Sequence, residues 1–148
     1  MKRLILGVLG LAAALVLVPT TAVADSATHS YVLVMEEANF GVAPNGDTVA
    51  IEGEGELSVN PKAVEGGGSF THRNAAGTVL ATGTWEATGL LDYQSYGCGV
   101  VFGTPIPPDF CGGRVAMRVM LTTPLGQLPG IINFNHTAGG DNVIIQTG

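Results

Sequence analysis

Apolar and polar residues alternate along much of the chain, most clearly between residues 48 and 59. The odd positions read Val, Ile, Gly, Gly, Leu and Val, whereas the even positions include Glu52, Glu54 and Glu56. Successive side chains of a β-strand point to opposite faces. The pattern therefore predicts a strand with one buried and one solvated face, since a helix would spread the glutamates around its circumference.

Residues 78–88 alternate in the same way, with Trp85 on the apolar face and threonines on the other. Residues 64–72 also alternate, and the Asn-Ala-Ala-Gly of 74–77 has turn composition. We therefore expect a hairpin of 64–72 and 78–88. Further strands are predicted over 30–38, 90–96, 113–122, 130–135 and 142–146, with turns at 44–47 and 138–141.

About eight short strands joined by tight turns predict an all-β fold, a single antiparallel β-barrel, with a β-sandwich as the alternative. Glycines recur on the inward face, at positions 53, 55, 66, 68 and 83. They favour the barrel, because a residue without Cβ lets a strand bend or lets a large neighbour such as Trp85 fill the interior.

The N-terminus has the composition of a secretory signal peptide. Lys2 and Arg3 precede an uncharged apolar run from residue 4 to residue 18, which is shorter than the roughly 20 residues that span a bilayer. Small residues at 22 and 24 fit a signal peptidase site, with cleavage after Ala24. We expect residues 1–24 to be a signal peptide and 25–148 a single secreted β domain of a bacterial protein; an uncleaved anchor is the alternative.

Removing residues 1–24 from the 148-residue chain leaves 124 residues, with all 12 acidic residues and four of the six basic ones, a net charge of −8. This charge argues against nucleic acid or an anionic membrane surface as partner. No other stretch is apolar enough for stable membrane insertion. The predicted location is extracellular or periplasmic.

The two cysteines, Cys98 and Cys111, fit an exported protein. Two thiols in one small domain outside the cytosol usually pair, and we expect a disulfide that stabilises the fold by about 3 kcal/mol in the chain-entropy model. Two cysteines 13 residues apart with no histidine between them match no zinc pattern.

Several short motifs resemble a family of small secreted bacterial proteins of unassigned function. They are the Gly-Gly-Gly-Ser-Phe-Thr-His of 66–72, the Gly-Thr-Trp-Glu-Ala of 83–87, the Gln-Ser-Tyr-Gly of 94–97, the Pro-Asn-Gly-Asp of 44–47 and the Gly-Gly-Arg of 112–114. The resemblance covers most of the chain after residue 24. It implies export and one β domain, and it carries no activity or functional residue with it.

Two other families offer narrower likenesses. The Gly-Thr-Trp of 83–85 is similar to the Gly-x-Trp of lipocalins and avidins, where the tripeptide lies on the first strand; here it lies in mid-chain. The glycine-rich strands also look like those of dirigent and allene oxide cyclase barrels, without a motif that transfers a site.

Glu52, Glu54 and Glu56 are the main cluster of like charges. We interpret them as a solvated face, or as one paired with Arg114 and Arg118 across the sheet. A calcium site is the alternative, although calcium prefers six to eight oxygens in a wrapping loop. A general acid/base pair is a further alternative.

The chain carries no catalytic or nucleotide motif. The histidines, His29, His72 and His136, occur singly, so neither a shared metal site nor a catalytic site built on His72 is favoured. We expect no cofactor.

The segment from 93 to 113 is rich in aromatic residues and proline, and the two cysteines bracket its centre. A stiff loop of this kind loses little entropy on binding, and the alternative is a connection whose aromatic residues close one end of the fold. The candidate ligand-binding residues are Tyr93, Tyr96, Phe102, Phe110, His72 and Arg114.

Three functions remain open from the sequence. The first is a non-catalytic secreted barrel with a binding or structural role and an unknown extracellular partner. The second is a carrier of a small apolar ligand, or a cyclase-like enzyme, with its site inside the barrel. The third is a calcium-dependent surface protein. The first two differ in whether the interior is filled or hollow.

Overall fold

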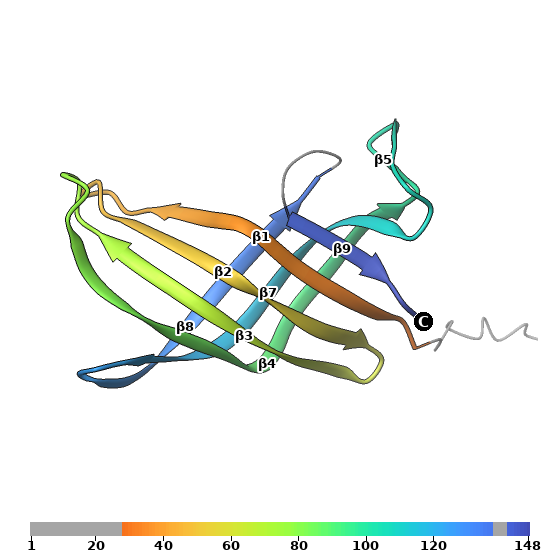
Figure 1. Ribbon diagram of the computed structural model, residues 1–148. Helices are drawn as coiled ribbons and strands as arrows, with labels where there is room; N and C mark the ends of the chain where they lie inside the picture. Colours follow the sequence, from red (N-terminus) through yellow and green to blue (C-terminus); the bar gives the residue numbers. More distant parts are fainter. Residues whose placement is uncertain (1–27, 138–141) are drawn as a thin grey trace, which may run out of the picture.

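The computed structural model describes residues 28–137 and 142–148, and within them the chain is all-β without a helix (Figure 1). The strands are β1 (Ser30–Val42), β2 (Thr48–Val59), β3 (Lys62–Arg73), β4 (Val79–Cys98), β5 (Val100–Val101), β6 (Thr104–Pro105), β7 (Phe110–Thr123), β8 (Gly126–His136) and β9 (Asn142–Gln146). The predicted signal peptide and the predicted turn at 138–141 lie outside the described residues. No membrane-spanning helix is found in the described part of the chain.

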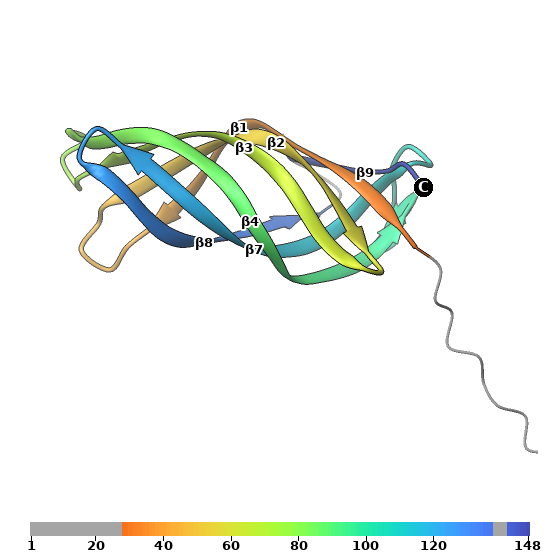
Figure 2. The same ribbon diagram turned by 90° about the horizontal axis from the view of Figure 1, so that it is seen from below.

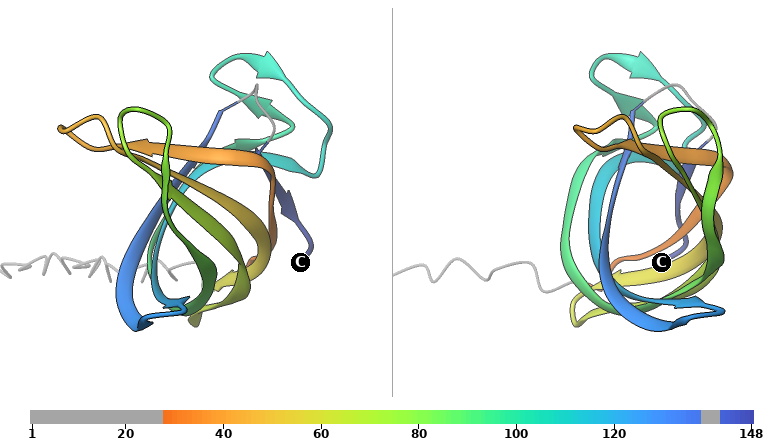
Figure 3. Two further views of the ribbon diagram at one scale, coloured as in Figure 1. Left: turned by 60° about the vertical axis from the view of Figure 1, so that its left-hand side comes forward. Right: turned by 90° about the vertical axis from the view of Figure 1, so that its left-hand side faces the viewer.

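All strand pairings are antiparallel. Seven strands form one sheet in the order β4-β3-β2-β1-β9-β7-β8, with an additional pairing of β4 with β7, and β5 and β6 form a separate small hairpin. The sheet curves so strongly that β2 and β3 lie opposite β7 and β8 (Figures 2 and 3). Within the described ladders, β8 pairs along one edge only, with β7.

The alternation of residues 48–59 is confirmed by β2, which has the predicted bounds. Glu52, Glu54 and Glu56 are exposed, while Leu57 on the opposite face is buried. The predicted hairpin is also confirmed, since β3 and β4 pair in a register that places Phe70 opposite Gly83.

The predicted strands at 78–88 and 90–96 are one strand, β4, of 20 residues. Its ladder with β7 shifts register between Ala87 and Gly89, between Leu90 and Asp92, and again between Ser95 and Gly97. Each extra residue reverses the alternation of faces, which made one irregular strand look like two in the sequence.

The core is a single cluster contributed mainly by β1, β7 and β8, with one residue each from β2, β4 and β9. Its buried members are Tyr31, Leu33, Met35, Leu57, Trp85, Cys111, Val115, Met117, Val119, Ile132, Phe134 and Ile144. The strand β7 lies at its centre, because it pairs with β4 along one edge and with β8 and β9 along the other.

Trp85 packs on glycines of β2 and β3. Gly53 faces Gly68 in the β2–β3 ladder, and Gly68 faces Trp85 in the β3–β4 ladder. A Cβ on Gly53 would lie 2.8 Å from Cζ2 of the indole, and one on Gly68 would collide with the carbonyl oxygen of Glu52. The same carbonyl accepts a hydrogen bond from Trp85 Nε1 at 3.0 Å. Gly53 therefore leaves the space that the indole fills, and Gly68 lets β2 and β3 approach each other beneath it.

The predicted disulfide is confirmed. Cys98 and Cys111 face each other in the β4–β7 ladder, with their Cα atoms 4.0 Å apart. The bond joins the two ends of a connection that carries β5 and β6.

Replacing Gly68 by alanine tests the close approach of β2 and β3 beside Trp85. The added Cβ would collide with backbone atoms of Glu52 and Gly53 in β2. We therefore expect Gly68→Ala to lower the free energy of unfolding by about 1–3 kcal/mol. Gly89→Ala is the matched control, because a Cβ there meets nothing within 4 Å, and it should change stability by less than about 0.5 kcal/mol. Urea unfolding measures both, and equal stability of the two variants would contradict the packing described.

Candidate functional site

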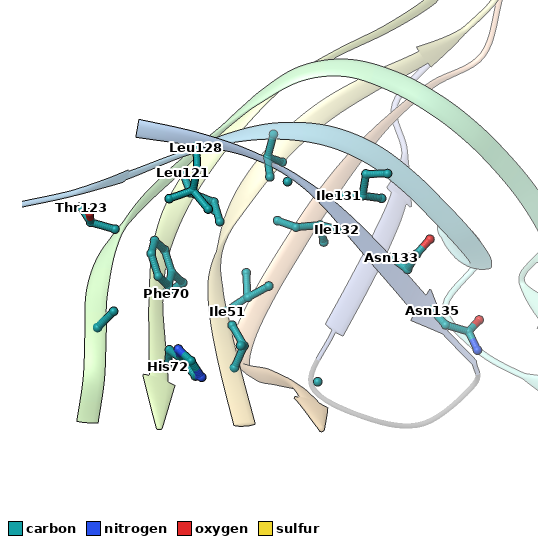
Figure 4. Close-up of a pocket in the computed structure, with 15 residues that line it drawn as sticks. Ile51, Phe70, His72, Leu121, Thr123, Leu128, Ile131, Ile132, Asn133 and Asn135 are labelled. Carbon is teal, nitrogen blue, oxygen red and sulfur yellow. The ribbon is translucent and has the colours of Figure 1, made fainter. Parts of the chain in front are cut away.

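A cavity of about 780 Å³ lies between the β2–β4 part of the sheet and the β7–β8 part (Figure 4). Fifteen residues line it. From β1 to β4 they are Gly41, Val49, Ile51, Phe70, His72 and Ala81; from β7 and β8 they are Val119, Leu121, Thr123, Leu128, Gly130, Ile131, Ile132, Asn133 and Asn135.

The first wall consists of two rows of side chains that cross neighbouring strands. Val49, His72 and Ala81 face one another in register across β2, β3 and β4, and Ile51 and Phe70 form the next row. Residues of one row share the inward face because the ladders place them directly opposite one another. Of these five side chains only that of His72 is polar.

The second wall comes from β7 and β8. Val119 faces Gly130, and Leu121 faces Leu128 in the ladder. Figure 4 shows Leu121 and Leu128 on the side of the cavity opposite Ile51. Leu128 remains 47 % exposed, because the cavity is open to solvent on this side.

The cavity begins where the core ends. Val119 and Ile132 belong both to the core cluster and to the cavity lining. Next to the row of Ile51 and Phe70 lies the row that Trp85 fills. On the side of Ile51 and Phe70 away from Trp85, glycine and alanine occupy several inward positions, including Ala81 and Gly130. The interior therefore widens there into open space.

Polar groups are few and lie towards the margin of the cavity. His72 Nε2 lies 3.0 Å from Asp47 Oδ2, with both side chains partly buried. An ionised carboxylate only accepts hydrogen bonds, so Nε2 carries the hydrogen and a neutral His72 keeps Nδ1 as an acceptor. Thr123, Asn133 and Asn135 supply the other polar side chains.

Among the candidate ligand-binding residues, the structure places only His72 in the cavity lining. Arg114 bonds to Asp92 on β4, with 3.2 Å between Nη2 and Oδ2, and both are about half exposed. The predicted pairing of Arg114 and Arg118 with the β2 glutamates is wrong, because β7 pairs with β4, β8 and β9 and not with β2.

Tyr93 packs into the core. Its ring centroid lies 4.7 Å from that of Tyr31. Its buried hydroxyl makes no well-formed hydrogen bond, although the Ser95 and Tyr31 side chains lie beside it. Burial raises the pKa of Tyr93 well above its ordinary value, with a smaller contribution from Tyr31.

The cysteine-bracketed segment combines both interpretations made from the sequence. Val101 is fully buried and occupies the space above Gly112, so the segment does close the core. Phe102 is 75 % exposed, and its ring lies 5.0 Å from that of Tyr96. Phe110 is half-buried. This segment lies at the end of the molecule away from the β1–β2 and β3–β4 turns (Figure 1).

Glutamates border a shallow hollow on the outer face of the sheet. Glu54, Glu56 and Glu65 line it together with glycines of β2 and β3. Across residues 28–137 and 142–148, no three His, Cys, Asp or Glu side chains come together in an arrangement that holds a metal ion. The calcium site stays a prediction.

Searches against protein-family models, curated proteins and solved structures find no match for this chain. The resemblance of residues 64–97 to secreted bacterial proteins therefore stays a prediction.

Sequence reasoning missed the contribution of β8. Leu128, Gly130 and Ile132 alternate with polar or exposed residues and read as an ordinary strand. Asn133 belongs to no motif, and the Asn-His-Thr of 135–137, formally a glycosylation sequon, does not indicate a cavity. Nothing in this pattern distinguishes a residue that lines a cavity from one that fills a core.

Replacing Tyr93 by phenylalanine tests its buried hydroxyl. A buried polar group without a partner costs about 1–3 kcal/mol, and phenylalanine keeps the ring contact with Tyr31. We expect Tyr93→Phe to raise the free energy of unfolding by about 1 kcal/mol, measured by urea unfolding. A clear loss of stability would show that the hydroxyl has a partner in the folded protein.

His136 gives the protein a pH dependence. It is 7 % exposed, and burial lowers its pKa below the ordinary value of 6.5. Below that value the unfolded chain takes up a proton on His136 that the folded chain resists, so the free energy of unfolding falls as the pH drops from 6.5 towards the lower, folded pKa.

His136→Gln should flatten this part of the stability profile, measured by urea unfolding between about pH 7.5 and pH 5. An unaltered slope in His136→Gln would assign the acid sensitivity to other groups.

Proposed function

We propose that the protein is an exported β-barrel that binds a small apolar molecule in the cavity between β2–β4 and β7–β8. The observation that carries the proposal is the cavity itself: about 780 Å³, with apolar walls and polar groups towards its margin. Sites for small molecules typically have about 300–1,000 Å³ and this kind of lining.

The strand pairings support the barrel. A path of hydrogen-bonded neighbours runs from β1 through β2, β3, β4, β7 and β9 and returns to β1. The β9–β7 pairing that completes it rests on two residue pairs, one of which contains Cys111. A ring of pairings with a hydrophobic interior is the architecture of small barrels that hold one ligand.

The disulfide and the N-terminal sequence support export. Disulfides persist in oxidising compartments, and Cys98–Cys111 lies where two strand ends need to stay together. The apolar run before Ala24 has the length of the apolar region of a signal peptide.

The cavity favours a ligand that is apolar along most of its length and polar at one point. Val49, Ile51 and Phe70 offer only dispersion contacts and the removal of apolar surface from water. His72, held by Asp47 at 3.0 Å, offers the ligand a hydrogen-bonding group on this wall. A ligand with several charges would lose hydration without finding partners there.

Filling the cavity tests the proposal. Ala81 lies in the first wall, half-buried, and Ala81→Phe places a ring into the open space. We expect this variant to weaken binding of the neutral apolar probe N-phenyl-1-naphthylamine about tenfold or more. The measurement is the rise in probe fluorescence on titration.

Ala63→Phe is the matched control, because Ala63 is exposed near the start of β3 and lines no part of the cavity. It should bind the probe as the unaltered protein does. Native mass spectrometry of the exported chain adds a second readout, namely a co-purifying ligand. Failure of the unaltered protein to bind any apolar probe would overturn the proposal.

A further inference from the structure

Exposed apolar side chains gather around the mouth of the cavity. The described residues include eight large hydrophobic side chains that are strongly exposed, and six of them form what we call the apolar rim. The apolar rim consists of Val42, Val79, Leu80, Leu125, Leu128 and Ile131. The other two, Val100 and Phe102, belong to the cysteine-bracketed segment.

Three hairpin turns place five of the six rim residues, and Ile131 lies farther along β8, opposite the exposed Arg118 of β7. The β1–β2, β3–β4 and β7–β8 turns lie at the same end of the molecule (Figures 1 and 3). Cavity-lining residues flank each of them: Gly41 and Val49 the first, His72 and Ala81 the second, and Thr123 with Leu128 the third.

Leu125, in the β7–β8 turn, has a fully exposed side chain. The hydrogen bonds that hold this turn do not involve the leucine side chain. The Leu125 N–H donates to Thr123 Oγ1 at 3.1 Å, and that hydroxyl donates to the Gly126 carbonyl at 3.1 Å. The fold therefore does not need a leucine at this position, and exposing one costs solubility.

This end of the molecule is close to neutral, unlike the rest. The three turns and the strand ends beside them carry one carboxylate, Asp47, and one guanidinium, Arg73. The exposed glutamates lie on the outer faces of the strands, at Glu52, Glu54 and Glu56 among others. A neutral, apolar end suits a zwitterionic lipid surface, whereas the acidic faces would be repelled by anionic lipid.

We propose that the apolar rim docks on a zwitterionic lipid bilayer, with the cavity mouth facing the lipid. Separate side chains on protruding turns can each enter the interface between head groups and acyl chains, where burial of apolar surface drives binding. The cavity lining continues into the rim through Leu128 and Ile131, which belong to both. An apolar ligand can thus pass from lipid to cavity without crossing water, an inference that rests on the proposed function.

A flotation experiment with phosphatidylcholine vesicles tests the docking. The protein is expressed with its own N-terminal segment, purified after export, and its mass is checked for removal of that segment. We expect the unaltered protein to float with the vesicles, and Leu125→Ser to lower its partition coefficient about tenfold. Phe102→Ser is the matched control: it removes an equally apolar, 75 % exposed side chain at the opposite end and should leave partition unchanged.

Three outcomes would overturn the docking. The first is the absence of vesicle binding by the unaltered protein. The second is an equal loss in Phe102→Ser, which would mean nonspecific adsorption. The third is a dimer in vesicle-free solution that Leu125→Ser dissociates, seen by analytical ultracentrifugation, which would assign the rim to a second copy of this chain.

Probe binding without vesicles separates this inference from the proposed function. Leu125 does not line the cavity, so Leu125→Ser should bind N-phenyl-1-naphthylamine normally while losing vesicle binding. Vesicle binding by a protein that takes up no probe would remove the proposed function and leave the docking intact. Probe binding by a protein that does not bind vesicles would overturn the docking and leave the proposed function intact.

Discussion

The indole of Trp85 rests on the backbones of β2 and β3, and the interior is arranged around that contact. Gly53 and Gly68 let the two strands and the ring approach one another, and the Glu52 carbonyl satisfies the indole N–H. Close packing of this kind leaves no room for a ligand at this level of the fold. One row farther along the same strands, Phe70 stands opposite Gly83 and the packing gives way to the cavity. A single tryptophan thus separates a filled half of the interior from a hollow half.

The strands were predictable where alternation is regular. Residues 48–59 place glutamate on every second position, and β2 exposes those glutamates. Prediction failed in β4, where the register shifts after Ala87, Leu90 and Ser95 interrupt the period of two. Such bulges depend on how β4 pairs with β7, a separate strand that follows the cysteine-bracketed connection, so no pattern within β4 reveals them.

The site was only partly predictable, because a cavity is defined by what the walls leave unfilled. His72 drew notice as a titratable residue on an apolar face, whereas Ala81 and Gly130 matter through their small size. Their effect appears only when β4 and β8 are brought to opposite sides of one space. The aromatic segment attracted the functional prediction instead, and there Val101 and Tyr93 serve to close the core.

The single-sided pairing of β8 has a mechanical consequence. Among residues 28–137 and 142–148, β7 is the one strand that pairs with β8, and residues of β8 between 128 and 135 supply part of the cavity wall. A strand bonded along one edge can swing about that edge by bending its neighbour, without breaking a ladder on its other side. The cavity therefore has one compliant wall facing a stiff one, in which β2 and β3 are paired along both edges. The internal width of the cavity can therefore adjust to ligands of different diameter.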